Sequence, residues 1–235
     1  MDIILVPGLW LDGSTWDQVV PHLEKAGHRV TELTMPGMES AGADRSAVSW
    51  QDQVDAVVAA VDAADGDVAL VGHSFGGMVA YCAVDQRPDK VGRIVFVGSE
   101  PADARPASED GGGFPLDGAD APLPEWSFFD DEMVADLDDA QRAAVREGSV
   151  PSPARAITDA FQLADDRRRD VPATVVACEY PVAQLKKWID DGEEGVAELA
   201  RLRDVEWVDL SSGHWPQVSR PEDLAAVIVK AVDRT

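Results

Sequence analysis

The stretch V-G-H-S-F-G-G-M, residues 71–78, constrains the fold of this chain more than any other. It directly follows the apolar run V-A-L-V (68–71), and glycines 72, 76 and 77 bracket Ser74. Glycine lacks a Cβ, so it permits a tight turn and a close approach of helix to strand. The pattern therefore predicts a strand, a sharp turn at Ser74 and a helix. This is the G-x-S-x-G arrangement that exposes a nucleophilic serine above a sheet.

Strand and helix signals alternate along the rest of the chain. Short apolar runs predict strands at 2–6, 28–35, 68–71, 92–98, 173–178 and 205–210. Helical patterns follow at 14–27, 49–66, 75–87, 182–190 and from Pro221 onward, the last with a core face of Leu224, Val227, Ile228 and Ala231. Such alternation predicts the α/β class, with a mostly parallel sheet covered by helices on both faces.

Residues 102–170 interrupt this pattern. They are rich in Pro, Gly, Asp and Ala, yet they carry Trp126, Phe128, Phe129 and Phe161, which a flexible linker would lack. We expect one domain over residues 1–235, with 102–170 as a lid-like insertion after the strand that ends near residue 98. Open α/β sheets bind ligands at the carboxyl ends of their strands. Trp126, Phe128 and Phe129 are therefore candidates for an apolar substrate lining, although each could simply pack against the scaffold.

Composition limits the partners. The chain has 44 acidic and 20 basic residues, a net charge of −24, which argues against nucleic acid and anionic membranes. We expect no membrane span, because no apolar run reaches about 18 residues. The first residues lack a basic segment and a cleavage site, so a cytoplasmic protein is expected. Cys82 and Cys178 form no ligand motif, so we expect reduced core thiols and no metal. Nothing in the sequence indicates the oligomeric state.

A serine hydroxyl needs a base to become a good nucleophile. Of the four histidines, His22 and His28 precede Ser74, and the side chain of His73 should point away from it. Only His214 follows, in the loop S-S-G-H-W-P (211–216) just past the last expected strand. Because that loop should emerge at the same sheet edge as Ser74, His214 is the candidate base.

The negative charge that develops on a carbonyl oxygen under attack needs two backbone donors. The N–H of Phe75, directly after Ser74, is the first candidate. The second should come from the loop V-P-G-L-W (6–10), where Pro7 has no N–H. Leu9 and Trp10 therefore both remain candidates for the second donor.

Three segments carry a family resemblance: V-P-G-L-W-L-D-G-S-T-W near the start, G-H-S-F-G-G, and S-G-H-W-P-Q near the end. Together they resemble the α/β-hydrolase superfamily, and within it the small esterase and hydroxynitrile-lyase-like group. The resemblance covers nearly the whole chain, although Pro7 stands where most members have histidine. It implies a serine hydrolase that cleaves a carboxylic ester, thioester or lactone through an acyl-enzyme on Ser74. It implies no cofactor and no metal.

The resemblance also implies an acidic residue that orients His214, and here the sequence departs from the family. The usual acid follows the strand at 173–178, where Pro181 occupies roughly its position. Some relatives place it after the preceding strand, where Gly98 stands. Glu179 and Glu100 are thus both displaced candidates, and Asp103 is a weaker third.

We favour Glu100 over Glu179. Glu100 follows an apolar strand, and its extra methylene compared with aspartate gives it reach. The Tyr180-Pro181 pair follows Glu179 at once, and the residue before a proline is pushed toward extended geometry. Two other functions stay open: a lyase that uses Ser74 and His214 as acid and base, and a non-catalytic protein that only binds a small molecule.

Overall fold

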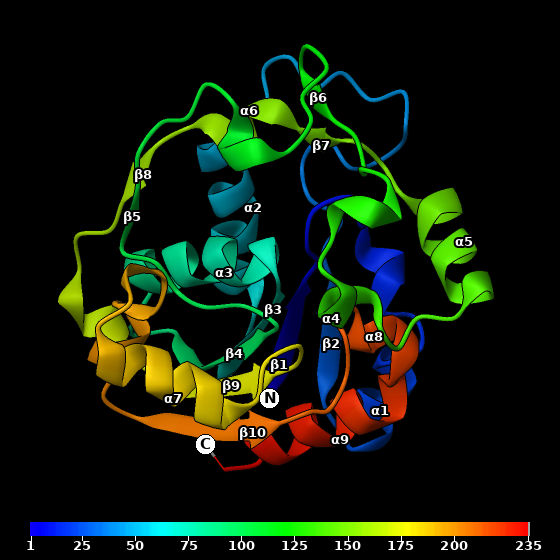
Figure 1. Ribbon diagram of the computed structural model, residues 1–235. Coiled ribbons are helices and arrows are strands. Elements are labelled where there is room, and N and C mark those ends of the chain that lie inside the picture. The colour runs from blue at the N-terminus through cyan, green and yellow to red at the C-terminus, as the bar shows by residue number, and fades with distance from the viewer. Residues whose placement is uncertain (235) are drawn as a thin grey trace.

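The computed structural model describes residues 1–234 and has a six-stranded sheet at its centre (Figure 1). The strand order is β10-β9-β4-β3-β1-β2, and every pairing within this sheet is parallel. The strands are β1 (Asp2–Val6), β2 (Arg29–Glu32), β3 (Val68–His73), β4 (Val91–Val97), β9 (Ala173–Ala177) and β10 (Val205–Asp209). The predicted α/β class with a parallel sheet is confirmed.

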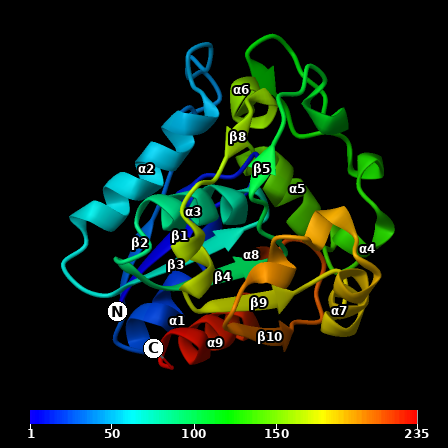
Figure 2. The same cartoon turned by 90° about the vertical axis from the view of Figure 1, so that its left-hand side faces the viewer.

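Helices cover both faces of the sheet (Figure 2). The first face carries α2 (Trp50–Ala63), α3 (Phe75–Gln86) and α7 (Val182–Asp191), whose apolar side chains join one hydrophobic cluster with the strands. The second face carries α1 (Val20–Lys25) and α9 (Pro221–Val232), which form a separate cluster. The alternation of inward side chains along the strands thus fills two cores, one on each side.

Two helices show how local sequence sets the boundaries. Ser49 caps α2, at the start of the helix that the sequence predicts, and its hydroxyl and the Asp52 carboxylate bond each other's main-chain N–H groups. The expected helix at 14–27 is instead interrupted. Asp12 caps a single 3₁₀ turn, η1 (Gly13–Trp16), and α1 begins only at Val20. The Asp12 carboxylate already satisfies the N–H and hydroxyl of Ser14, so Ser14 does not start an α-helix.

Residues 102–170 leave the sheet after β4 and return before β9. They contain β5 (Ala104–Arg105), η2 (Gly111–Gly113), β6 (Asp120–Ala121), η3 (Trp126–Phe128), α4 (Asp131–Val134), α5 (Asp139–Gly148), β7 (Ser152–Pro153), α6 (Ala154–Thr158), β8 (Phe161–Gln162) and η4 (Asp166–Asp170). Figure 1 shows the segment arching from α6, beside α2, to α4 and α5 on the opposite side. It therefore lies over the region where β3 passes into α3.

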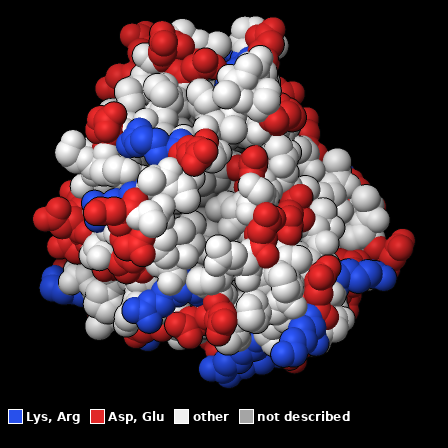
Figure 3. All heavy atoms as spheres, turned by 90° about the vertical axis from the view of Figure 1, so that its right-hand side faces the viewer, with Lys and Arg blue, Asp and Glu red and all other residues white. Residues whose placement is uncertain are grey.

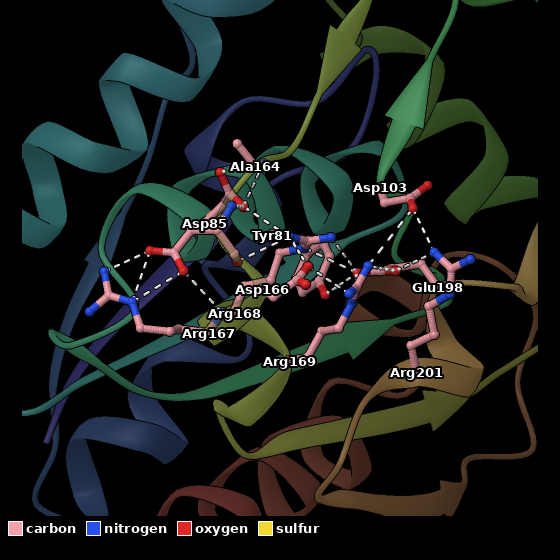
Figure 4. A network of polar contacts seen from close by, with 11 residues as sticks. Tyr81, Asp85, Asp103, Ala164, Asp166, Arg167, Arg168, Arg169, Glu198 and Arg201 are labelled. Carbon is pink, nitrogen blue, oxygen red and sulfur yellow. Dashed lines mark hydrogen bonds and ion pairs between the residues drawn. The ribbon is translucent and has the colours of Figure 1, made fainter.

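A buried ion network ties both ends of this segment to the scaffold (Figure 4). Its centre is Glu198, 2 % exposed, between η5 (Glu194–Val196) and η6 (Leu199–Arg201). Glu198 accepts hydrogen bonds from the Tyr81 hydroxyl at 2.8 Å, from Arg168 at 3.0 Å and from Arg169 at 2.9 Å. Arg201, which pairs with Asp103 at 2.7 Å, links the start of the segment to the same network.

Replacing Glu198 with glutamine should lower the free energy of unfolding by about 3 kcal/mol at neutral pH, the lower end for a broken buried ion pair, because it removes the carboxylate that Arg168 and Arg169 share while Asp85 and Asp166 still face their guanidinium groups. Burial acts to raise the pKa of Glu198, but the bonds from Arg169 and Tyr81 and the charge of Arg168 outweigh it, so this pKa lies below its ordinary value. The stabilisation is therefore complete above the ordinary glutamate pKa and is lost as the pH falls through the depressed one.

Urea unfolding of Glu198→Gln and wild type at neutral and acidic pH measures the loss in the free energy of unfolding and its dependence on pH. The control is Asp191→Asn, which removes an exposed ion pair with Lys187 and should change stability by less than about 1 kcal/mol. Equal, small losses in the two variants, or a Glu198→Gln loss that does not shrink in acid, would show that the network does not stabilise the fold.

Two further expectations concern the chain as a whole. Cys82 and Cys178 are both buried and free, as the sequence predicts. None of the helices in residues 1–234 combines the length and the apolar character needed to cross a membrane.

Candidate active site

Ser74 lies at the turn between β3 and α3. Its φ of 52° and ψ of −127° are unusual for a residue with a side chain. Such strained backbone persists only where the surroundings fix it, and it is common at functional sites. A Cβ on Gly76 would lie 2.9 Å from the Pro7 carbonyl carbon, so the loop after β1 packs directly on the first turn of α3. The predicted strand, sharp turn and helix at Ser74 are confirmed.

His214 lies between Ser74 and a carboxylate. Its Nε2 is 2.7 Å from the Ser74 hydroxyl oxygen, and its Nδ1 hydrogen-bonds the carboxylate of Glu179. The loops after β3, β9 and β10 supply these three side chains, because parallel strands end at the same sheet edge. The imidazole can thus accept the serine proton at Nε2 while Nδ1–H donates to the carboxylate.

The structure corrects the expected partner of His214. The favoured candidate was Glu100, but Glu179 makes the contact with Nδ1. The reason lies at Gly98, which has a φ of 51°. A Cβ at Gly98 would be 3.4 Å from the Glu179 carboxylate and 3.6 Å from His214 Nδ1, so Glu179 from the neighbouring strand already fills that position. Asp103 pairs with Arg201 in the ion network instead.

The two glutamates near His214 differ in the direction in which their surroundings shift the pKa. Burial acts to raise the pKa of Glu179, but the hydrogen bond from His214 and its charge outweigh it, so the pKa is lowered and the group is ionised. Burial also raises the pKa of Glu100, to about 7, and the negative charge of Glu179 adds to the rise. Glu100 is therefore a carboxyl group that gains its charge near neutral pH, close to the active site.

The candidate backbone donors are only partly as expected. Phe75 is the first residue of α3, so its N–H lies at the start of the helix beside Ser74. The N–H of Trp10 donates to the Ser152 hydroxyl at 2.8 Å, and its ring nitrogen donates to the Ala121 carbonyl at 3.0 Å. Trp10 thus holds the segment over the site, and Leu9 remains the candidate for the second donor.

Aromatic residues of the insertion reach the site through Trp215, which the sequence analysis did not single out. The Trp215 ring lies 5.0 Å from the His214 ring, 5.2 Å from Phe129 and 5.6 Å from Trp126, measured between centroids. Phe129 is 8 % exposed, whereas Phe128 is 46 % exposed. Of the three expected lining residues, Trp126 and Phe129 therefore lie near the site and Phe128 lies at the surface.

The space-filling view of one side of the molecule shows acidic side chains scattered over that face, with basic side chains in a few groups, several of them along the lower edge (Figure 3). A cavity of about 620 Å³ is lined by Glu179 together with Cys178, Asp136, Asp209 and residues 211–213 among others. Residues 1–234 contain no group of three or more histidine, cysteine, aspartate or glutamate side chains arranged to hold a metal ion.

Comparison with known proteins defines the class. Residues 3–227 match the model of the alpha/beta hydrolase family, so the chain belongs to this family. Its relatives carry the names of esterases and lipases, and the chain is accordingly a hydrolase, as the sequence predicts.

Three similar proteins illustrate the likeness. Methylesterase 7 of Arabidopsis thaliana is 25% identical, over 98% of this chain and 96% of its own length. Lipase LipV of Mycobacterium tuberculosis is 27% identical, over 96% and 91%. An extracellular alpha/beta-hydrolase from a Paenibacillus species, described as sharing homology with tobacco salicylic acid binding protein 2, has a TM-score of 0.77 at 22% identity, with 98% of each chain covered. This last likeness supports the fold alone.

Proposed function

We propose that this protein is a carboxylesterase in which Ser74 is the nucleophile, His214 the general base and Glu179 the residue that orients His214. The continuous line of contacts from the Ser74 hydroxyl through both ring nitrogens of His214 to the Glu179 carboxylate supports this assignment most strongly. Ser–His–acid lines of this kind activate serine in unrelated folds. The strained turn at Ser74 adds a second, independent support.

In the first half of the reaction, the Ser74 oxygen attacks the ester carbonyl carbon while His214 Nε2 takes the hydroxyl proton. The Glu179 carboxylate stabilises the imidazolium that forms. The N–H groups of Phe75 and Leu9 would donate to the carbonyl oxygen as it becomes negative. When the carbon–oxygen bond to the alcohol breaks, His214 gives its proton to the leaving oxygen, and the acyl group stays on Ser74.

The second half repeats these steps with water. His214 takes a proton from a water molecule, the resulting hydroxide attacks the acyl carbon, and the proton returns to the Ser74 oxygen as the acid leaves. Both halves need only the residues named, since the base and the acid are the same imidazole. The contact between Glu179 and His214 supports Glu179 as the orienting acid, and it argues against a non-catalytic binding protein. Among the described contacts of Ser74, His214 and Glu179, none favours the lyase alternative.

We propose small, uncharged esters with an apolar acid part as substrates. The aromatic group of Trp126, Phe129 and Trp215 beside His214 suits such a part. The net charge of −24 disfavours anionic substrates. Several relatives are named methylesterases, which supports esters of a small alcohol.

A panel of methyl and p-nitrophenyl esters with increasing acyl length tests this function. We expect hydrolysis of short and aromatic acyl esters, and little activity on acyl chains with an added carboxylate. A purified, folded protein that hydrolyses none of the panel would contradict the proposal.

We further propose that residues 102–170 act as a lid whose aromatic side chains limit the acyl group. Trp126→Ala should then shift the preference on the ester panel toward longer or bulkier acyl groups, because it opens space beside Trp215. Phe128→Ala is the matched control, since Phe128 belongs to the same short 3₁₀ helix but is exposed, and its preference should equal that of wild type. An unchanged preference in a folded Trp126→Ala variant would refute the lid.

A further inference from the structure

His73 precedes Ser74 in the chain, but the mechanism above assigns it no step. Its side chain is 1 % exposed, and its Nε2 lies 2.6 Å from the main-chain carbonyl oxygen of His214. The two imidazole rings are 5.0 Å apart between centroids. The residue beside the nucleophile is thus bonded to the main chain of the candidate base, in addition to the bond between Ser74 and His214.

The partners of His73 define where its proton lies. A carbonyl oxygen can only accept, so Nε2 must carry the hydrogen. Burial, aided by the charge of His214, lowers the pKa of His73 to about 3, which keeps the ring neutral and leaves Nδ1 without a proton. Nδ1 faces the side-chain amide nitrogen of Gln217 at 3.3 Å, a donor that it can accept from. His73 therefore donates to His214 and accepts from Gln217.

The side-chain amide of Gln217 turns its nitrogen toward His73, which fits an Nδ1 that carries no proton. Its side chain is buried, and its amide nitrogen faces His73 Nδ1 and, at 3.5 Å, the Thr15 hydroxyl. Its amide oxygen is buried with no hydrogen-bond partner among the described residues. An unsatisfied buried acceptor destabilises a fold, so the orientation needs a compensating interaction. The contact with His73 supplies one.

The main chain of His214 is held from two sides. Its N–H donates to the carbonyl of Met133, in α4 of the insertion, at 2.7 Å, and its carbonyl accepts from His73. The strands β3 and β10, whose loops carry Ser74 and His214, are not neighbours in the sheet. The bond from His73 therefore bridges two strand ends that the sheet itself does not pair.

We propose that His73 is a positioning residue that locks the main chain of His214 to the nucleophile's own turn, with Gln217 holding His73 in the required tautomer. The proposal rests on the catalytic assignment of Ser74 and His214 above. The contacts of His73 are with the His214 carbonyl and Gln217 and not with the reacting groups of Ser74 or His214, so its loss should slow both steps in which His214 moves a proton, acylation and deacylation, and not the binding of substrate. A misplacement of about 1 Å in a catalytic group can reduce a rate by about 10²-fold.

Two substitutions of His73 test this. His73→Leu removes the donor to the His214 carbonyl and should lower kcat on p-nitrophenyl acetate by about 10²-fold with KM within about twofold of wild type. His73→Gln keeps an amide N–H near the position of Nε2 and should recover at least about tenfold of that loss. Because His73 does not titrate near neutral pH, the pH profile of kcat/KM in His73→Gln should keep the shape of the wild-type profile.

A second residue and a control separate positioning from folding. Gln217→Met removes the donor to Nδ1 at similar volume and should lower kcat, though less than His73→Leu. His28→Leu removes another buried histidine, which lies near Asp233 away from the site, and should leave kcat at the wild-type value. Circular dichroism and the melting temperature report folding, and if His73→Leu does not fold, Gln217→Met decides.

Three results would overturn the inference: wild-type kcat in folded His73→Leu, a loss confined to KM, or equal loss in His73→Leu and His73→Gln. Unchanged kcat in Gln217→Met would overturn the part played by Gln217, and the whole proposal where it is the deciding variant. If the proposed esterase function is wrong, the result differs from all of these. Wild type itself would then neither hydrolyse p-nitrophenyl acetate nor react with a fluorophosphonate probe.

Discussion

Ser74→Ala should reduce kcat on every active ester by several orders of magnitude, about 10⁶-fold by comparison with other serine triads. The reason is that no other group at the turn can form the acyl-enzyme once the hydroxyl is gone. Substrate should still bind, because the backbone donors and the aromatic side chains remain. The measurement is steady-state hydrolysis, with substrate protection against proteolysis as a separate report of binding.

The variant must also keep its fold for this result to be meaningful. Ser74 has a positive φ, which alanine tolerates about as poorly as serine, so the melting temperature should stay close to that of wild type. A folded Ser74→Ala protein that keeps more than about a thousandth of wild-type kcat would show that the reaction does not pass through Ser74.

Glu179→Gln should have the second-largest effect, a decrease in kcat of about 10²- to 10⁴-fold. Glutamine has nearly the same shape but carries no charge, so it neither stabilises the imidazolium nor holds Nδ1–H as the donor. Steady-state kinetics across pH measure the effect. Glu100→Gln is the matched control, because it changes the other half-buried glutamate near His214 in the same way and should lower kcat by less than about tenfold.

The control has a pH dependence of its own. The pKa of Glu100 is raised to about 7, so wild type and Glu100→Gln carry the same charge at this position below that pH. Above it, the ionised Glu100 of wild type adds a negative charge that favours the His214 imidazolium. We therefore expect the two pH profiles of kcat/KM to coincide in acid and wild type to be faster in base. A larger loss in Glu100→Gln than in Glu179→Gln would return the orienting role to Glu100.

The sequence predicted the parts of the site that depend on local geometry. The turn at Ser74 needs glycine at fixed spacings, and a strand before it and a helix after it are visible in the same few residues. His214 was found because it alone follows Ser74 in the chain. The carboxylate was harder, since its contact with His214 depends on which of two strand ends approaches the ring. The left-handed turn at Gly98, which leaves that place to Glu179, has no signature that separates it from an ordinary loop glycine.

Contacts between residues far apart in the chain explain the other differences between the sequence-based expectations and the structure. The sequence does not separate Trp10 from Leu9 as the second backbone donor to the carbonyl oxygen. The Trp10 N–H donates instead to the Ser152 hydroxyl, and Ser152 is 142 positions away in the chain. The roles proposed for His73 and Gln217 depend on the same kind of contact. The exposed position of Phe128 could not be separated from those of Trp126 and Phe129, because the short 3₁₀ turn at 126–128 sets which ring faces inward.

Mass spectrometry of the intact protein after reaction with a fluorophosphonate probe tests the central claim most directly. Such probes phosphonylate a serine only when a base activates it, so the reagent reads the nucleophile without any assumption about substrate. Wild type should gain the mass of one probe, with the modified peptide carrying Ser74, and Ser74→Ala should gain none. An enzyme that hydrolyses esters yet stays unlabelled, or that is labelled and inactivated at another residue, would contradict the assignment of Ser74 as the nucleophile.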